Sequence, residues 1–583
     1  MVKSLERHEL RHQALRAIDG IRGVSRSTLV DIVRALRELP LDASDVTAWK
    51  LNASRHDSEH AFITEICVPS CKGHDLRIHV ADMRLQLQRT CANSPRFCSI
   101  VERALRRCPN GPTQKWGIVM YCDEITPGNI LAPMLERKSM NVYYSFKEFG
   151  NQLLSQRAMW FTLATVRVRT IQCADGGWST VLASILRQTF CCALSPSSAG
   201  VALMLPSGPR TVFLTLRHIL ADLDAHRQTL DLKGAKGLKP CPLFCPCVVA
   251  KGDTLTSQDR RLVDITCGER ARFGTTSSED VYRVYDVVLE AKRRYRDGNL
   301  TKARYEAVEK SSGFNANPHG VMAATDLRGI FSPSAMVSID PMHVLWSNGI
   351  INEEVSLFMN SCPLTWAEWA RLGSVEWQWP GFLSSSQKSR VKRALSEHCL
   401  TKNEGDKYFA SDMLMIYPLV RHFAELYFER HRPDDASFVS LARACELADY
   451  VKNAKYNGVD AAKRDALVAG HLVAFIAAYG SDAVRPKHHF AFHIGNLDCF
   501  TTEAKHSTLK SLANNIKNTR DYERSLSTVA QADQERALEE VADGEGLIGP
   551  TATWEGHVVA DMAVIAACKF FTNDIVCCGE VSA

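Results

Sequence analysis

The sequence predicts an α/β protein whose mixed β-sheet core is interrupted by a large all-α insertion. Two observations predict this class. Between Trp116 and Asp222, short apolar and β-branched segments surround one helical segment, whereas residues 251–480 repeat apolar side chains at helical spacing. With 583 residues, 45% of them hydrophobic, the chain can bury a substantial core.

Composition and charge narrow the class of protein. The first residues are charged and lack the apolar segment that directs secretion, so we expect no export signal. The longest apolar stretch, residues 467–480, is shorter than a membrane span and contains His471, which indicates a buried helix and no membrane partner. The 20 cysteines are therefore expected to be free thiols in a reducing compartment. A net charge of +5 is too small to identify a nucleic-acid-binding protein.

Residues 1–105 are expected to form a helical N-terminal region. Between Leu10 and Leu41 the sequence predicts two helices, and Ser25 or Ser27 could cap the second one. Two interpretations stay open for this pair. It is either a helix-turn-helix that docks on DNA or a helical pair that only packs.

Residues 106–250 are expected to form the first part of the sheet core. Three strands and then a helix are predicted to begin near Trp116, Asn141, Phe161 and Trp178. The segments VALMLP and TVFLTLRHILAD supply one or two further strands, the last of which ends at Asp222. Three strands, a helix and another strand with an acid at its end is the order of an RNase H-like fold.

The remaining chain is expected to contain three further parts. Residues 251–480 form the all-α insertion. Residues 481–525 complete the core with a helix that begins near Thr501 and carries Glu503 in its first turn. Residues 526–583 are a C-terminal tail to which the sequence assigns no role.

Asp123, Asp222 and Glu503 are the candidate catalytic acids. Hard divalent cations need several carboxylates at one point in space, and these carboxylates need not be close in sequence. Asp123 and Asp222 end predicted strands, and Glu503 lies on a helix after the insertion. Because the chain has 65 acidic residues, spacing alone leaves many other such triplets open.

Six segments resemble, in their order, the blocks of CACTA-related and Plavaka-like eukaryotic DNA transposases, and the resemblance extends from about Leu29 to Lys517. They are WGIVMYCDEITPGN, YYSFKEFG, LADLDAH followed by KGAKGLKPCPLFC, IDPMHVLWSNGI, RPKHHFAFHI and DCFTTEAKHSTLK. The resemblance implies an RNase H-like core in which Asp123, Asp222 and Glu503 hold two Mg²⁺ or Mn²⁺ ions. It also implies cleavage of double-stranded DNA by water and then strand transfer by the freed 3′-hydroxyl. A nuclear location and a homo-oligomer are further expectations.

Other acids stay open as alternatives. Asp224 lies two residues beyond Asp222, although the resemblance places the acid directly after the apolar strand. Glu124 would point to the opposite face of the strand from Asp123. Asp340 and His343 resemble an acid-x-x-His element that supports the site, and Asp340 could itself be the second acid.

Cys241, Cys245 and Cys247 form a cysteine cluster that could bind structural Zn²⁺. Two of these thiolates could act with ligands such as His343 or Cys267. Relatives in the resembling family tend to show CxxC at this block, whereas the first spacing here is CxxxC. Without metal, the three residues would be buried thiols in a proline-rich turn.

Several cationic and aromatic residues are candidates for contact with DNA. On and before the last predicted helix they are His488, His489, Lys505, His506 and Lys510. Trp366, Trp369, Trp377 and Trp379, followed by the basic residues 388–393, could stack on an unpaired base or could build a core. Residues 292–296 are a second basic cluster. For each of these helical residues, solvated surface is the competing interpretation.

These expectations converge on a metal-dependent DNA transposase of a transposable element, which acts in DNA recombination. The rival from another class is a domesticated or decayed relative that binds DNA or protein without catalysis. A nuclease of the same fold, which hydrolyses DNA without strand transfer, is a third hypothesis.

Overall fold

The computed structural model describes residues 61–571 except 129–132, 235–237, 250–261, 275, 362–384, 397–408, 517–519, 542–545, 555–556 and 566–567. Contacts divide the chain into Met1–Thr64 and Glu65–Ala583, and nearly all described elements belong to the second unit. The helical pair expected between Leu10 and Leu41 and the tryptophans expected to stack on DNA lie outside the described residues.

A seven-stranded mixed sheet is the centre of the second unit. Its order is β1-β2-β5-β4-β3-β8-β11. β2 pairs antiparallel with β5, β5 with β4 and β4 with β3, whereas β3 pairs parallel with β8 and β8 pairs parallel with β11. The strands are β1 Ile63–Val68, β2 Leu76–Ala81, β3 Trp116–Ile125, β4 Ser139–Phe146, β5 Phe161–Arg167, β8 Leu214–Ala221 and β11 Val337–Ile339. The expected mixed α/β class is confirmed.

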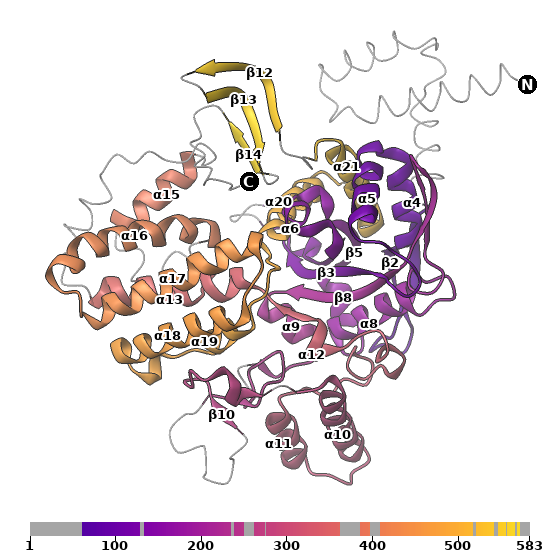
Figure 1. Ribbon diagram of the computed structural model, residues 1–583. Coiled ribbons are helices and arrows are strands. Elements are labelled where there is room, and N and C mark those ends of the chain that lie inside the picture. The colour runs from indigo at the N-terminus through magenta and orange to yellow at the C-terminus, as the bar shows by residue number, and fades with distance from the viewer. Residues whose placement is uncertain are drawn as a thin grey trace, which may run out of the picture. The chain divides into compact units, whose positions relative to one another are not determined.

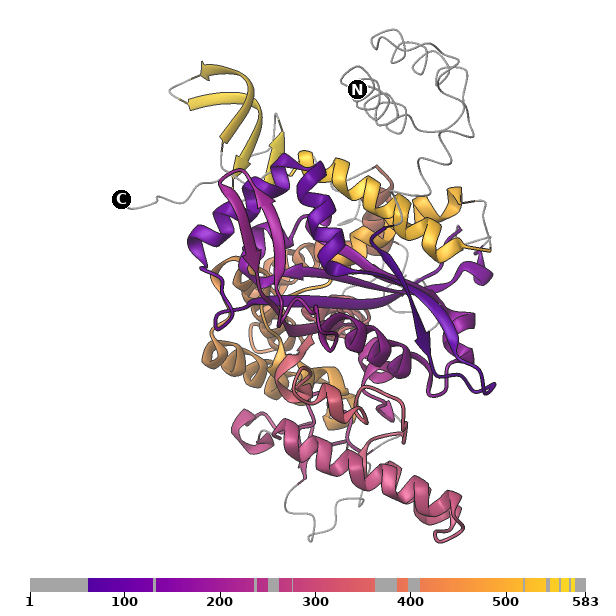
Figure 2. The same ribbon diagram turned by 90° about the vertical axis from the view of Figure 1, so that its right-hand side faces the viewer.

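Helices cover both faces of this sheet (Figures 1 and 2). On one face lie α4 (Met83–Asn93), α5 (Pro95–Arg107) and α21 (Tyr522–Glu539), and on the other lie α8 (Gly177–Phe190) and α9 (Leu223–Thr229). Burial on both faces explains why β3 and β4 consist of apolar and aromatic runs without strict alternation. The shorter elements nearby are α6 Gly150–Leu154, α7 Val168–Cys173 and the hairpin of β6 Val201–Leu205 and β7 Gly208–Val212.

The elements predicted between Trp116 and Asp222 are confirmed, because β3, β4, β5, α8 and β8 follow in the expected order. The expectation that residues 251–480 are all helical is wrong. β10 (Val263–Asp264) pairs with β9 (Cys247–Val248), and β11 joins the main sheet beside β8. A three-residue strand such as β11 is too short to carry a periodic signal in the sequence.

Most of the remaining described elements between Ser278 and Asn515 are helices. They are α10 Ser278–Arg296, α11 Lys302–Ser312, α12 Pro333–Met336, α13 Ile350–Ser361, α15 Ser385–Ser396, α16 Ala410–His431, α17 Ala436–Asn457, α18 Ala461–Tyr479, α19 Pro486–Phe490 and α20 Phe500–Asn515. A π-helical turn, η8 (Met342–Trp346), follows β11. The apolar stretch at 467–480 lies in α18, and within the described residues no helix has the length and apolar character needed to span a membrane.

One cluster of buried apolar side chains joins the sheet to these helices. It includes Val119 on β3, Leu220 on β8 and Cys245 in the loop after α9, and it continues through Trp346 to Leu447 on α17. The sheet and the helices α13, α16, α17 and α18 therefore share a hydrophobic core. Residues from the segment before α20, including Ile494 and Cys499, belong to the same cluster, so this core holds the segment against the sheet.

The ends of the described chain differ from expectation. β1 and β2 are strands inside the region expected to be helical, residues 1–105. α21 crosses the expected boundary at residue 525 and packs on β5, so the first part of the supposed tail belongs to the sheet core. Beyond it, β12 Gly546–Trp554, β13 His557–Ile565 and β14 Cys568–Phe571 form an antiparallel three-stranded sheet.

Candidate active site

Three acids lie side by side at one edge of the sheet, where the pairing of three neighbouring parallel strands ends. The register pairs Cys122 of β3 with Ala221 of β8, and Ala221 with Ile339 of β11. The next residues are Asp123, which is still within β3, and Asp222 and Asp340, which directly follow β8 and β11. Since parallel strands end side by side, the fold places these carboxylates along one edge.

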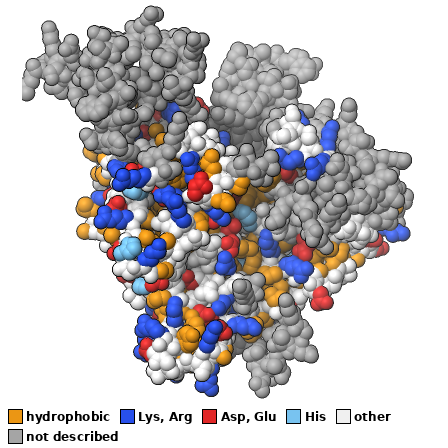
Figure 3. Space-filling view, turned by 180° about the vertical axis from the view of Figure 1, so that it is seen from behind, with side chains coloured by type: hydrophobic (Ala, Val, Ile, Leu, Met, Phe, Trp, Pro, Cys, Tyr) orange, Lys and Arg blue, Asp and Glu red, His pale blue; other side chains and the backbone are white. Residues whose placement is uncertain are grey.

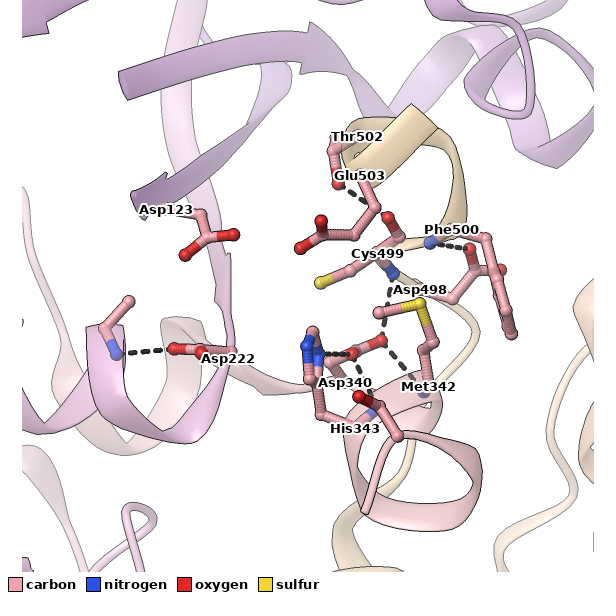
Figure 4. Close-up of polar contacts among 12 residues, drawn as sticks. Asp123, Asp222, Asp340, Met342, His343, Asp498, Cys499, Phe500, Thr502 and Glu503 are labelled. Atoms are coloured by element: carbon pink, nitrogen blue, oxygen red, sulfur yellow. Dashed lines mark hydrogen bonds and ion pairs between the residues drawn. The ribbon is translucent and has the colours of Figure 1, made fainter. Parts of the chain in front are cut away.

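Glu503, in the first turn of α20, completes the group. Figure 4 shows the carboxylates of Asp123 and Glu503 pointing toward one another, with Asp222 and His343 bordering the same space. The hydroxyl of Tyr121 lies 3.0 Å from Oδ2 of Asp123 and 2.8 Å from Oε1 of Glu503. Nδ1 of His506 lies 3.4 Å from Oε2 of Glu503 and 3.6 Å from Oδ2 of Asp123. The side chains of Asp123, Glu503 and His506 are close enough to hold a metal ion.

The two carboxylates share protons with Tyr121. Burial first, and then the charges of Glu503 and Asp222, raise the pKa of Asp123 well above its usual value. Burial opposes ionisation of Glu503, but hydrogen bonds from His506, Asp123 and Tyr121 lower its pKa. One hydroxyl carries one proton and can donate it to only one carboxylate at a time. The two directions favour a protonated Asp123 beside an ionised Glu503, which accepts a hydrogen bond from the Tyr121 hydroxyl.

Asp222 faces the site and also caps a helix. Its Oδ1 accepts a hydrogen bond of 2.6 Å from the backbone N–H of Ala225, which fixes the side chain at the start of α9. Asp222 is not within the close group of Asp123, Glu503 and His506, but its charge acts on Asp123. Its second carboxylate oxygen has no hydrogen bond among the contacts of the described residues.

The two neighbouring acids that stayed open as alternatives lie elsewhere. Asp224 is exposed and pairs with Arg227 and Gln228 of its own helix, each at 2.8 Å. Glu124 forms an ion pair of 2.6 Å with Lys138. These contacts favour Asp222 and Asp123 as the residues that face the site.

Asp340 holds His343 and the segment before α20. Its Oδ1 accepts from the backbone N–H groups of Met342 at 3.1 Å and Cys499 at 2.9 Å. Its Oδ2 accepts from the backbone N–H of His343 at 2.9 Å and lies 2.5 Å from Nδ1 of the same residue. With these four contacts its carboxylate is used for positioning, which is the supporting role expected for the acid-x-x-His element.

The imidazole of His343 borders the acid site. Burial opposes a charge on its imidazole, but the hydrogen bond to Asp340 and the charges of Asp340, Asp222 and Glu503 raise its pKa. In Figure 4 the ring lies between Asp222 and Asp340. Asp340, His343 and Cys499 form a second group whose ligand atoms are close enough to hold a metal ion.

Cys241 and Cys245 meet His493 and also His489, which the sequence interpretation assigned to DNA. Nε2 of His493 lies 3.6 Å from Sγ of Cys241, 3.5 Å from Sγ of Cys245 and 3.2 Å from Nε2 of His489. These four side chains form a third group that could hold a metal ion. Cys247 is outside the group although its thiol contacts that of Cys241, and the ligands considered from sequence, His343 and Cys267, are not members.

The residues expected to contact DNA are mostly buried. His488 and His489 are 1% and 0% exposed, and His488 packs on the rings of His471 and Phe475. Lys505 is buried beneath the ring of Tyr143, and burial lowers its pKa to about 7. Lys510 is half-exposed. Of the five residues expected to contact DNA, Lys510 is therefore the one with solvent access. The ring of His506 contacts Asp123 and Glu503 instead.

The basic clusters lie on helix surfaces. Residues 292–296 are in α10, where Arg293 pairs with Glu290 and Asp297. Residues 388–393 are in α15, where Arg390 pairs with Asp412. On the face drawn in Figure 3, Lys and Arg side chains are interspersed with Asp and Glu side chains. This mixture agrees with the small net charge of the sequence.

Two residues at the site were missed from sequence. Tyr121 lies two residues before Asp123, so strand alternation would have placed both on one face. Lys487 donates to the backbone carbonyls of Ser347 and Asn348 at 3.1 and 2.7 Å. Burial lowers the pKa of Lys487 to about 8, while the charges of Asp222 and Asp340 act in the opposite direction. Lys487 lies in the segment RPKHHFAFHI, but only the fold brings it near those acids.

The protein-family models and the curated proteins contain no match for this chain.

Proposed function

We propose that this chain is a DDE-type DNA transposase, or a protein derived from one, that cleaves DNA and transfers its strands. The observation that carries the proposal is the convergence of Asp123 and Glu503. Tyr121, which contacts both carboxylates, is 382 residues away from Glu503 along the chain. Convergence over such a separation is what the resemblance to CACTA-related and Plavaka-like transposases requires of its first and last acids.

The strand order supports an RNase H-like core. β5, β4 and β3 are antiparallel neighbours, and β8 and β11 extend the sheet parallel to β3. Asp123 lies near the end of the first strand of this five-stranded part, counted along the chain, and Asp222 directly follows the fourth. The helices between β11 and α20 would then be the expected insertion, with α20 returning Glu503 to the sheet.

The donor set fits Mg²⁺ or Mn²⁺. Asp123, Asp222 and Glu503 offer hard carboxylate oxygens, which these ions prefer. The raised pKa of Asp123 reflects uncompensated negative charge from Glu503 and Asp222 in a buried site, and a divalent cation would neutralise that charge. When bound, a pair of such ions activates the attacking hydroxyl and stabilises the leaving oxygen of a phosphodiester.

The remaining side chains would orient these groups. Asp340 fixes the tautomer of His343, whose ring borders the acid site and could donate to a phosphate oxygen. Tyr121 and His506 hold the Glu503 carboxylate against β3. Double-stranded DNA would be the partner, and action on chromosomal DNA implies a nuclear location. Assembly as a homo-oligomer belongs to the same proposal.

Nicking of supercoiled plasmid DNA by the full chain tests the proposal. We expect nicking in Mg²⁺ or Mn²⁺ that chelation abolishes, and a loss of at least about 100-fold in Asp123→Asn and Glu503→Gln. Asp224→Asn is the matched control, because Asp224 is exposed and pairs with Arg227. It should nick as the unsubstituted chain does.

The same assay separates the rival functions. Equal inactivity of the unsubstituted chain and of Asp123→Asn would instead support a non-catalytic DNA- or protein-binding protein. Nicking without joined products, when donor ends and target DNA are both supplied, would support a nuclease that does not transfer strands.

A further inference from the structure

A second group of metal-ligand side chains lies outside the acid site. Cys241 and Cys245 come from the loop after α9, whereas His489 lies in α19 and His493 in the 3-10 turn η10 (Ala491–His493). The sulfur and ring-nitrogen atoms of the four residues all lie within 4.8 Å of one another. Cys241 and Cys245 are each 2% exposed and His489 is 0% exposed. The fold therefore brings four soft or borderline donors together in a buried place.

The distances within the group match the edges of a zinc tetrahedron. Zinc bonds of about 2.3 Å to sulfur and about 2.0–2.1 Å to nitrogen give tetrahedral edges of about 3.6 Å between sulfur and nitrogen and about 3.3 Å between two nitrogens. The measured separations from His493 Nε2 are 3.6 Å to Cys241 Sγ, 3.5 Å to Cys245 Sγ and 3.2 Å to His489 Nε2. All three agree with those edges to within about 0.2 Å.

Hydrogen bonds alone do not account for this arrangement. Nε2 of His493 has one lone pair or one proton, so it can form one good hydrogen bond at a time. It nevertheless faces the two sulfur atoms and the His489 nitrogen together. A cation in the middle would satisfy all four donors at once.

The local structure holds the donors in place. Phe244, between the two cysteines, has a φ of 60°, a left-handed conformation that is strained for a bulky residue. Its ring stacks on Phe314 at 5.5 Å, and the ring of Phe273 packs on His489 at 4.3 Å. The turn that carries both thiols is thus held by the contact between Phe244 and Phe314, and His489 is held by its contact with Phe273.

We propose that Cys241, Cys245, His489 and His493 form a tetrahedral Zn²⁺ site with a structural role. Two thiolates and two imidazoles with no carboxylate favour Zn²⁺ over Mg²⁺ or Ca²⁺, and four protein ligands leave no open position for catalysis. This site is independent of the proposed transposase activity.

The zinc ion would anchor the segment that carries Glu503. His493 is followed by Ile494, which bridges to Ile339 of β11, and the N–H of Cys499 bonds to Asp340. The ion would therefore tie the loop after α9 to the chain between α19 and α20. Loss of zinc should loosen α20 from the sheet.

Elemental analysis of the purified full chain tests the site without DNA or Mg²⁺. We expect a zinc content one equivalent per chain higher in the unsubstituted protein than in Cys241→Ser. Cys267→Ser is the matched control, because this half-buried thiol lies outside the group and should keep the full content. His493→Cys replaces one zinc ligand by another and should also retain the ion.

Cobalt provides the second readout. Co²⁺ in place of zinc should give the visible absorption of tetrahedral cobalt and a thiolate-to-metal band in the near ultraviolet, both lost in Cys241→Ser. Unchanged zinc content in Cys241→Ser would overturn the proposal. The proposal would also be overturned if the folded unsubstituted chain, given excess zinc, bound no more zinc than Cys241→Ser. This outcome does not depend on whether the chain nicks DNA.

Discussion

At the scale of single residues, the pair Asp123 and Glu503 should destabilise the metal-free fold and should favour binding of a divalent cation. Burial, and then the negative charges of Glu503 and Asp222, raise the pKa of Asp123, and Tyr121 bridges the carboxylates of Asp123 and Glu503. Such a site is unfavourable for the metal-free fold when both acids are ionised. A divalent cation bound between the two carboxylates would be attracted to both and would remove the repulsion between them.

Replacement of Asp123 by asparagine should stabilise the metal-free protein at neutral pH. An acid whose pKa is higher in the folded state than in the unfolded chain destabilises the fold once the pH rises above its unfolded value. Asp123→Asn removes this penalty, so we expect a higher Tm than that of the unsubstituted chain in chelator. This difference in Tm should vanish when the pH falls below the pKa of aspartate in the unfolded chain. There Asp123 is protonated in both the folded and the unfolded state and no longer destabilises the fold.

Mg²⁺ provides the control for this stability measurement. It should raise the Tm of the unsubstituted chain, since the ion binds the folded state. The Tm of Asp123→Asn should stay nearly constant. A lower Tm for Asp123→Asn than for the unsubstituted chain in chelator would contradict the interpretation of the acid pair.

At the scale of elements, the sequence predicts the acids best where a long apolar run precedes each one. The apolar runs before Asp123 and Asp222 are long enough to identify β3 and β8. The expected strand end is correct for Asp222, whereas β3 continues beyond Asp123 to Ile125. Glu503 could be chosen only through the resemblance, because a glutamate in a first helical turn is common. The position of Asp340 beside the others depends on β11, whose three residues carry no pattern.

Long-range packing accounts for the elements that the sequence interpretation missed. α21 has a polar composition, yet it packs on β5, and its Leu526 and Leu538 are buried. Its Gln531 side chain bonds to Gln86 and Thr90 of α4 at 2.7 and 2.9 Å. The meeting of His489 and His493 with two cysteines that are distant in sequence also depends on the fold. The i,i+4 spacing of the two histidines does not predict it, because residues at this spacing share a face on any helix.

Substitutions in α21 test whether this helix belongs to the core. Leu526 is fully buried, so Leu526→Ala should cost about 2–5 kcal/mol of unfolding free energy. Val529, which is 39% exposed on the same helix, is the control, and Val529→Ala should change the free energy by less than about 0.5 kcal/mol. Denaturant unfolding provides the comparison. Equal effects of the two substitutions would mean that α21 does not pack on the sheet as described.

At the scale of the molecule, a continuous core joins the sheet to the helices. Buried residues run from Val119 and Tyr121 on β3 to Ala444 and Leu447 on α17. A buried pair, Glu354 of α13 and His471 of α18 at 3.0 Å, adds a polar link within the helices. The sheet edge and the segment that returns Glu503 are therefore parts of one packed unit.

Hydrogen exchange of the native protein tests this continuity. If the sheet and the helices unfold together, the central amides of β3 and of α17 should share one opening free energy. Mild denaturant should lower both by the same amount. A lower opening free energy for α17 with an unchanged one for β3 would show that the helices unfold as a separate unit.

Binding of Mn²⁺ to the full chain, followed by the electron paramagnetic resonance of the free ion, tests the central claim most directly. The acids of β3 and α20 should give saturable Mn²⁺ binding that Glu503→Gln weakens by at least about 100-fold, a loss of about 2.7 kcal/mol. Asp224→Asn should bind as the unsubstituted chain does, because Asp224 pairs with Arg227 away from the site. Equal Mn²⁺ affinity of the unsubstituted chain and of Glu503→Gln would contradict the account.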